Sequence, residues 1–301
     1  MKNQLAAMWL QRNDRSFGEK LMTRHPAVFE KKRILVIGAH PDDCEIKAGG
    51  TAALWAKAGH HVRFVSATNG GTGHHEIGGI ELVRRRVAEA AAAARVIGIE
   101  SQVLEITNGE VEPSLHYRRM FIKLIREFKP DLILTHRPND YHPDHRYTSQ
   151  LVQDSAYVVT VPNNLPTTPA LRDNPVIAYL DDDFQKPLPF QPDVVVDIDP
   201  VVEKKLDMLH CHESQFYEWL PWNQRKENQV PAGAGERRAW LREQRIKANA
   251  DCANQYRRKL IQFYGRKKGS RIKHAEAFEA CEYGSRLTAE LIKNLFPFVC
   301  P

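Results

Sequence analysis

Short apolar runs alternate with helical patterns along most of this chain of 301 residues, and this alternation constrains its fold more than any other feature. The runs are rich in Val, Ile and Leu and are continuous in their apolarity, which is typical of strands covered on both faces. We predict strands over Arg33–Gly38, Val62–Ala67, Gln102–Ile106, Asp131–Thr135, Pro175–Leu180 and Asp193–Ile198.

Helical patterns separate these runs. Gly59 and Gly98 follow the first two patterns, as glycines at helix C-termini do, and Pro130 and Pro162 lie just beyond the next two. The order β-α-β-α-β-α-β predicts a Rossmann-like α/β fold, with a doubly wound, mostly parallel sheet and right-handed crossovers. We predict helices over Ile46–Ala58, Glu81–Ile97, Leu115–Phe128, Asp144–Val159 and Val201–His212.

The C-terminal part of the chain is basic. Between Leu220 and Lys273 there are 15 Lys and Arg residues against four Asp and Glu residues, while the whole chain carries a net charge of +6. We predict a helix from about Gly235 to Leu260, a loop over Gly265–Lys273 and a short helix around Glu276–Cys281. Because no nucleic-acid-binding motif accompanies the charge, we interpret it as a solvated helical face and expect no nucleic-acid partner. Attraction of anionic lipid headgroups or of an anionic substrate is the alternative explanation.

Length and composition fit one globular domain over residues 1–301. We divide it into an N-terminal lead over 1–32, an α/β catalytic core over 33–215 and a basic, mainly helical extension over 216–301. No apolar run approaches the roughly 20 residues that a membrane-spanning helix needs, and the N-terminus has no secretory signal pattern. Five cysteines without a Cys-x-x-Cys pair argue against a disulfide framework, so we expect a cytoplasmic protein.

Two histidine–aspartate clusters carry the chemistry of the sequence. They are Ala39-His40-Pro41-Asp42-Asp43-Cys44-Glu45 and Asp140-Tyr141-His142-Pro143-Asp144-His145, and each contains the run His-Pro-Asp. The first directly follows one predicted strand, and the second shortly follows another. Since ligands of doubly wound sheets bind outside the carboxyl ends of the strands, we expect the two clusters to form one site.

The clusters together predict a catalytic metal site. His40 and Asp43 lie in a turn whose backbone Pro41 fixes, and His145 would be the third ligand, from the second cluster. Two imidazoles and one carboxylate leave a coordination position open to water, as catalytic zinc sites do. The same donors form the facial triad of non-haem iron oxygenases, so Fe²⁺ or another divalent ion is the alternative to Zn²⁺.

The remaining side chains of the clusters predict metal-assisted hydrolysis. We expect Asp42 to act as general base and His142 to stabilise an oxyanion. We expect Asp144 to hydrogen-bond His142 and raise its pKa, and Glu45 and Asp140 to tie down the two loops. A nucleotide-binding site is disfavoured, because the turn after the first strand lacks the glycine fingerprint that a pyrophosphate requires.

These residues resemble the signature of a known family, the PIG-L/LmbE-like metal-dependent N-deacetylases. Its members act on N-acetylglucosaminyl-phosphatidylinositol, on the glucosaminyl-inositol and glucosaminyl-malate precursors of bacterial thiols, and on diacetylchitobiose. The resemblance covers about residues 33–215. The blocks that carry it are Ala39–Thr51, Thr68-Asn69-Gly70, Arg86-x-x-Glu89-Ala90, His142-Pro143-Asp144-His145, Asp197-Ile198 and Lys205…His212-x-Ser214-Gln215.

The resemblance implies zinc on His40, Asp43 and His145, and it implies two residues that contact the substrate. Arg86 matches an arginine that contacts sugar hydroxyls, with a surface arginine paired to Glu89 as the alternative. Asn108 stands where several sugar-specific members carry Asp. The resemblance therefore implies that its amide hydrogen-bonds a hydroxyl of the substrate, but it does not identify the sugar.

The function that we expect is removal of an N-acetyl group from an amino sugar or glycoconjugate, with release of acetate and free amine. The alternatives are deacylation of a non-sugar amide on the same scaffold and, ranked lower, an iron oxygenase. The expected partner is a small amino-sugar substrate. The motifs fit lipid, inositol, malate and sugar aglycones alike, and they fit a monomer and a homo-oligomer alike.

Overall fold

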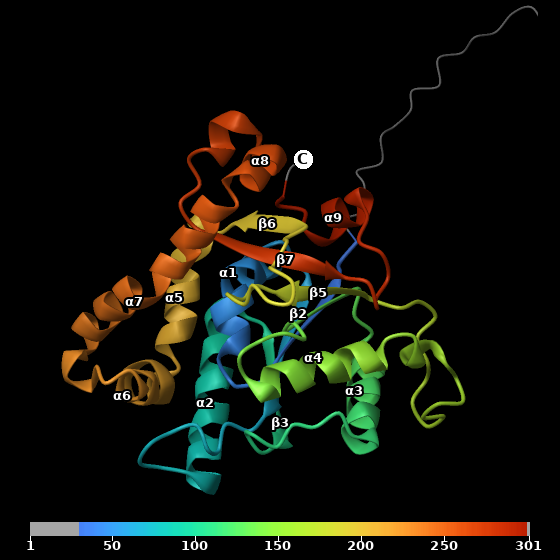
Figure 1. Ribbon diagram of the computed structural model, residues 1–301, viewed down its shortest axis with the longest axis horizontal. Helices are drawn as coiled ribbons and strands as arrows, with labels where there is room; N and C mark the ends of the chain where they lie inside the picture. The colour runs from blue at the N-terminus through green and yellow to red at the C-terminus, as the bar shows by residue number, and fades with distance from the viewer. Residues whose placement is uncertain (1–29, 300–301) are drawn as a thin grey trace, which may run out of the picture. The chain divides into compact units, whose positions relative to one another are not determined.

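A seven-stranded sheet forms the centre of the fold (Figure 1). The computed structural model describes residues 30–299, so most of the predicted lead over 1–32 lies outside the described residues. The strand order is β3-β2-β1-β4-β5-β7-β6. The strands are β1 (Arg33–Gly38), β2 (His61–Thr68), β3 (Glu100–Ile106), β4 (Leu132–Thr135), β5 (Val176–Leu180), β6 (Val194–Asp197) and β7 (Ala275–Cys281).

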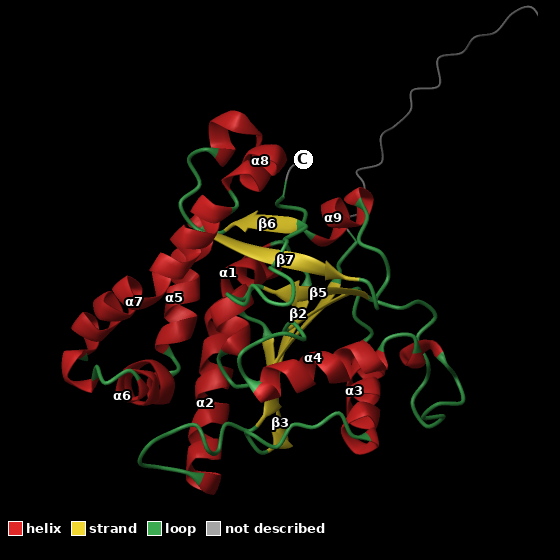
Figure 2. Cartoon of the chain, in the orientation of Figure 1, coloured by secondary structure: helices red, strands yellow, loops and turns green. Residues whose placement is uncertain are grey.

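Helices connect the strands, and the predicted Rossmann-like α/β fold is confirmed (Figure 2). The helices are α1 (Asp43–Lys57), α2 (Gly79–Ile97), α3 (Leu115–Phe128), α4 (Pro143–Ser155), α5 (Val202–His210), α6 (Leu220–Asn223), α7 (Ala234–Gln255), α8 (Arg257–Gly269) and α9 (Ala289–Leu295). Within residues 30–299, no helix combines the length and the apolarity that crossing a membrane would take.

Successive side chains of β1 point to opposite faces of the sheet, so both faces are apolar. Ile34 and Val36 pack on the face that α1 covers, where Trp55 is buried. Leu35 and Ile37 pack on the face that α3 and α4 cover. All four β1 side chains are fully buried, which explains why the run is continuously apolar in sequence.

The direction of winding reverses between β1 and β4. Strand β1 pairs in parallel with β2 on one side and with β4 on the other, and Ile37 is in register with Thr135. The residues that follow Gly38 and Thr135 therefore leave the same edge of the sheet next to each other. This is the crevice where open α/β sheets bind their ligands.

The short helix predicted around Glu276–Cys281 is wrong, because this segment is strand β7. It pairs antiparallel with both β5 and β6. Alanine and glutamate favour helices, but burial between two strands overrides that preference. The Glu276 carboxylate is held inside by Nζ of Lys205 at 2.7 Å and by the hydroxyl of Thr51 at 2.6 Å. The predicted extension thus completes the sheet.

Helix boundaries also differ from the sequence prediction, most clearly in α4, α7 and α8. The helix predicted to reach Val159 ends at Ser155, where the backbone turns into a positive φ at Tyr157. The helix predicted over Gly235–Leu260 is divided into α7 and α8. Helix α8 continues through much of the predicted loop, with Gly265 at a φ of 75° inside it. Helix α7 packs beside α5, with Leu241 buried against Leu206 and Phe216 (Figure 1).

Candidate metal centre and active site

The turn between β1 and α1 is held together by the Asp43 carboxylate. Its Oδ2 accepts hydrogen bonds from the backbone N–H of Ala39 at 3.0 Å and of His40 at 2.7 Å. A Cβ on Gly38 would lie 2.8 Å from Cβ of Asp43, so a glycine is required where the strand ends. The first cluster is therefore a rigid turn that presents His40 and Asp43 together.

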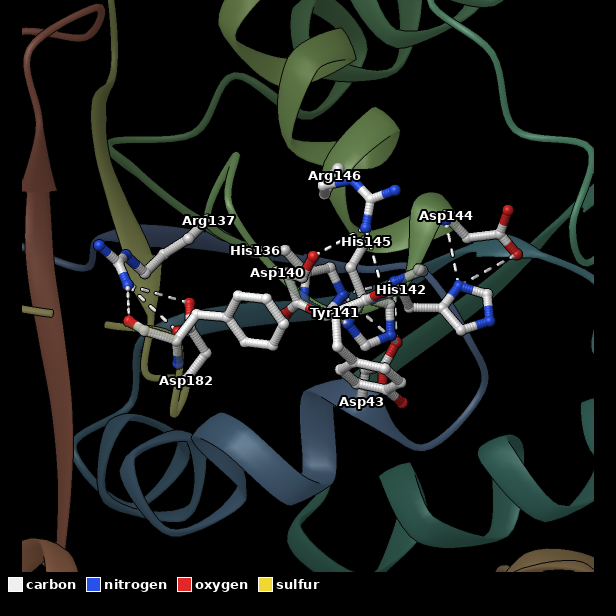
Figure 3. Close-up of polar contacts among 12 residues, drawn as sticks. Asp43, His136, Arg137, Asp140, Tyr141, His142, Asp144, His145, Arg146 and Asp182 are labelled. Carbon is white, nitrogen blue, oxygen red and sulfur yellow. Dashed lines mark hydrogen bonds and ion pairs between the residues drawn. The ribbon is translucent and has the colours of Figure 1, made fainter. Parts of the chain in front are cut away.

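The three predicted ligands meet at the edge of the sheet. Nδ1 of His40 lies 3.3 Å from Oδ2 of Asp43, Nε2 of His145 lies 3.4 Å from the same oxygen, and the two nitrogens are 3.2 Å apart. Donors bound at about 2.0–2.1 Å around a tetrahedral zinc ion lie about 3.3–3.4 Å from one another. The donor atoms are thus spaced as a single small divalent ion requires. Figure 3 shows Asp43 and His145 turned toward each other from separate segments.

A carboxylate supports each of the two imidazoles from behind. Oδ2 of Asp144 lies 3.1 Å from Nε2 of His40, and Oδ1 of Asp140 lies 2.9 Å from Nδ1 of His145. Although burial acts in the opposite direction, the Asp144 and Asp43 carboxylates raise the pKa of His40 to about 9, so the site favours positive charge. Such outer carboxylates fix the orientation of metal-binding imidazoles and leave the other ring nitrogen free.

The prediction that Asp144 hydrogen-bonds His142 through its carboxylate is therefore wrong. Its Oδ2 is 3.9 Å from Nδ1 of His142 but accepts the backbone N–H of Gly109 at 2.7 Å. Asp144 is fully buried at the start of α4, so its side chain points into the protein toward His40. His142 instead accepts the backbone N–H of Asp144 at its Nδ1, over 3.1 Å, and caps α4.

His136, which follows β4 directly, is a residue of the site that the sequence patterns did not predict. Its Nε2 accepts the backbone N–H of Ala39 at 2.9 Å, and its ring stacks on that of His145 with centroids 3.9 Å apart. Burial and the neighbouring His145 lower its pKa to about 4. Its position at a strand end, opposite the first cluster, was the signal that could have found it.

In two overlapping groups of the described residues, the ligand atoms lie close enough to one another to hold a metal ion. They are His40 with His142 and His145, and Asp43 with His136 and His145. Nε2 of His136 has one lone pair, and this lone pair accepts the backbone N–H of Ala39 in the turn. We therefore do not count this nitrogen among the metal ligands. The donors that remain include all three predicted ligands.

Asp42 lies beside this centre with Arg86 against it. Nη2 of Arg86 lies 3.3 Å from Oδ1 of Asp42 and donates a hydrogen bond of 2.6 Å to the carbonyl of Pro41. Burial raises the pKa of Asp42, and Arg86 opposes that rise. Arg86 is buried, which excludes the surface alternative, and Glu89 binds Ser214 and Arg85 instead. A Cβ on Gly70 would approach Arg86 to 3.0 Å, so glycine there admits its side chain.

Tyr141 and His142 border the open side of the site. The His142 ring meets the His40 ring edge-on, with centroids 4.6 Å apart, and its side chain is 31% exposed. Burial lowers the pKa of His142, and His40 and His145 lower it further, opposite to the predicted rise. The ring of Tyr141 is largely exposed and lies edge-on to both His142 and His145 (Figure 3).

Asn108 lies in the loop after β3, next to the segment that binds Asp144. Within residues 30–299, its buried Oδ1 has no hydrogen-bond partner. A buried acceptor without a partner is costly, so a ligand donor at this position would be stabilising. The next residue, Gly109, donates its backbone N–H to Asp144, so Asn108 lies at the edge of the site.

Comparison with known proteins places this site in a family. Residues 35–156 match the family described as PIG-L: GlcNAc-PI de-N-acetylase. The diacetylchitobiose deacetylase of Thermococcus kodakarensis is 32% identical over 203 residues, which are 64% of this chain and 73% of that protein. The 4-oxalmesaconate hydratase of Pseudomonas putida is 25% identical over 197 residues, 63% of this chain and 76% of that protein.

A solved structure agrees with the sequence comparison. The N,N′-diacetylchitobiose deacetylase from Pyrococcus horikoshii superposes with a TM-score of 0.64 at 25% identity, covering 90% of this chain and 88% of that one. Residues 35–156, which the family model matches, contain both His-Pro-Asp clusters, and the predicted resemblance is confirmed. The chain is an enzyme of the PIG-L/LmbE-like family.

Proposed function

We propose that the chain is a metal-dependent hydrolase that removes the N-acetyl group of an amino sugar or glycoconjugate. The observation that carries this proposal is the spacing of the donor atoms of His40, Asp43 and His145, which lie 3.2 to 3.4 Å from one another. Likeness to two proteins named diacetylchitobiose deacetylases supports a sugar acetamide as the substrate.

We assign a divalent ion, zinc as the first choice, to His40, Asp43 and His145. Zinc is commonly held by histidine nitrogen and carboxylate oxygen, and three protein ligands are the number found in its catalytic sites. When bound, such an ion polarises a carbonyl group and makes water more acidic. Fe²⁺ accepts the same donors, so the native metal is to be measured by elemental analysis.

Asp42 serves as the general base in this proposal. Arg86 holds one of its carboxylate oxygens, at 3.3 Å. Asp42 also directly precedes the proposed ligand Asp43 in the chain, which keeps it beside the metal centre. Asp42 takes a proton from water as that water's oxygen bonds to the acetamide carbon. The proton then passes to the amine nitrogen as the C–N bond breaks, which gives acetate and the free amine.

His142 stabilises the negative charge that develops on the carbonyl oxygen. Because its Nδ1 accepts a backbone N–H, the neutral ring carries its proton on Nε2. The ring is partly exposed at the site, so this N–H can donate to the oxyanion without the ring being charged. Asp144 contributes by orienting His40, and Asn108 offers a carbonyl oxygen to a substrate hydroxyl.

Acetate release tests this function. The zinc-loaded protein is incubated with N,N′-diacetylchitobiose, N-acetylglucosaminyl-inositol and N-acetylglucosaminyl-malate, with and without a chelator. We expect acetate and free amine in equal amounts from at least one sugar, loss of turnover with the chelator, and recovery when zinc is returned. Absence of acetate from all three sugars, at full zinc content, would refute a sugar deacetylase.

A second candidate function is addition of water to an unsaturated carboxylic acid. The likeness to 4-oxalmesaconate hydratase, which covers 63% of the chain against 64% for the deacetylase, favours it. Loss of ultraviolet absorbance from 4-oxalmesaconate, with no acetate formed from sugars, would support this candidate.

Acetylated amines without a sugar, in the same acetate assay, test the non-sugar alternative. Oxygen uptake with a 2-oxo acid tests the oxygenase alternative.

A further inference from the structure

Arg245, on helix α7 of the basic segment, lies next to the proposed active site. It lines a cavity of about 100 Å³ together with Ile46 and Lys47, which follow the metal ligand Asp43 by one turn of α1. Its guanidinium lies 4.8 Å from the centroid of the Phe216 ring. It also interacts electrostatically with Asp42 and Tyr141, the proposed base and the exposed ring at the site.

The other arginines along α7 have partners, and Arg245 differs from them. Arg238 binds Asp207 at 2.7 Å, and Arg242 binds Glu203, so both are paired to α5. Arg237 donates to the carbonyl of Pro231 at 2.9 Å. Among residues 30–299, no carboxylate or carbonyl oxygen forms an ion pair or hydrogen bond with Arg245. Its fork of donors is therefore available to a ligand.

The surroundings of Arg245 favour an anionic ligand. Its side chain is half-buried, and burial lowers its pKa. Asp42 and Tyr141 oppose that shift, but within residues 30–299 neither forms an ion pair or hydrogen bond with the guanidinium. A guanidinium in this state gains from a carboxylate or phosphate, whose oxygens fit its planar fork with two parallel hydrogen bonds. Asp42 does not fill this place, because its carboxylate contacts Arg86. The cavity is also lined by two lysines, but Lys47 is paired with Asp181 at 3.5 Å and Lys205 with Glu276 at 2.7 Å. Among the described residues that line it, Arg245 is therefore the cation without a carboxylate partner.

We propose that Arg245 binds an anionic group of the substrate, a carboxylate or a phosphate, while the acetamide lies at the metal centre. This inference rests on the proposed function and deepens it, since it selects substrates whose aglycone is charged. Tyr141 and Phe216 would border the path between the two ends of the substrate. The basic segment then contributes one specific side chain to recognition.

The test compares three N-acetylglucosamine compounds that differ in charge. They are the neutral inositol glycoside, the malate glycoside with two carboxylates, and the 1-phosphate. kcat/KM for acetate release is measured with zinc-loaded wild type, Arg245→Gln, Arg245→Lys and the matched control Arg242→Gln. The quantity read is the ratio of kcat/KM for each anionic compound to that for the neutral one, because effects on the chemical step cancel in this ratio.

For wild type we expect the ratio to exceed one for the malate glycoside, the phosphate or both, and the compound preferred identifies the anion. Losing one charge-assisted contact should lower that ratio about tenfold to a hundredfold in Arg245→Gln, mainly through KM. Arg245→Lys should retain part of the preference, and Arg242→Gln should match wild type. An unchanged ratio in Arg245→Gln, or equal losses in Arg245→Gln and Arg242→Gln, would overturn the proposal.

A binding measurement separates this inference from the proposed function. If the zinc-loaded wild type releases no acetate from any sugar, the deacetylase proposal fails while the anion site stays testable. Calorimetry with malate and with glycerol 1-phosphate then compares wild type, Arg245→Gln and Arg242→Gln. Binding at least about tenfold weaker in Arg245→Gln alone supports the site. Equal binding in all three proteins, or none in wild type, refutes it.

Discussion

Nδ1 of His40 and Nε2 of His145 lie 3.2 Å apart although 105 residues separate them in the chain. Two imidazole nitrogens come this close without an ion only where a carboxylate or a shared proton compensates, and Oδ2 of Asp43 lies against both. The pairing of β1 with β4 creates this proximity, because each strand ends next to one of the clusters.

Removing one ligand should abolish metal binding. We predict that His145→Ala is purified with less than about a tenth of the zinc of wild type, because two remaining ligands hold zinc poorly. Elemental analysis after dialysis measures this. His116→Ala, which removes an exposed histidine on α3, is the control and should keep its zinc. Full zinc content in His145→Ala would show that other donors hold the ion.

Replacing the proposed base should separate catalysis from metal binding. Asp42→Asn should keep its zinc but lower kcat for acetate release by about 10²–10⁴-fold, as loss of general base catalysis does. Zinc content and kcat are measured on the same sample. Turnover within twofold of wild type would remove Asp42 from the mechanism.

The carboxylate behind His40 should tune the affinity for metal. Asp144→Asn should weaken zinc binding about 10–100-fold, the usual effect of losing the partner of a ligating histidine. Competition with a chromogenic chelator measures the dissociation constant. Asp154→Asn, on the opposite end of α4, controls for a general effect on the helix. If Asp144→Asn bound zinc as tightly as wild type, the support that we assign to this carboxylate would be wrong.

The buried ion pair between Lys205 and Glu276 should contribute strongly to the free energy of unfolding. Lys205 donates to Glu276 at 2.7 Å and to the carbonyl of Ile46 at 2.7 Å, and both charged side chains are almost fully buried. Lys205→Met leaves the Glu276 carboxylate without its cation, so we predict a loss of about 3–5 kcal/mol in the free energy of unfolding. Urea unfolding measures the loss. Lys204→Met, at an exposed neighbouring position, should change it by less than about 0.5 kcal/mol.

Features encoded locally could be predicted from the sequence. The buried strands β1, β4, β5 and β6 are mostly apolar runs, so the strand ends that the two clusters follow could be located. The proposed ligands came from the residue types within the clusters. The fold class required only the order of elements and the handedness of their crossovers.

Features that depend on distant partners could not be predicted. Strand β7 has the composition of a helix and becomes a strand only because β5 and β6 flank it. The orientation of Asp144 toward His40 depends on where α4 begins relative to β1, which no local pattern records. Arg245 is one of many arginines in the basic segment, and only the packing of α7 distinguishes it from its paired neighbours.

The most direct test of the account is a crystal structure of the zinc-loaded protein with anomalous data collected on both sides of the zinc absorption edge. The account predicts one anomalous peak about 2.0–2.2 Å from Nδ1 of His40, Nε2 of His145 and a carboxylate oxygen of Asp43. A fully occupied peak elsewhere, or a fold in which His40 and His145 face separate regions, would contradict it.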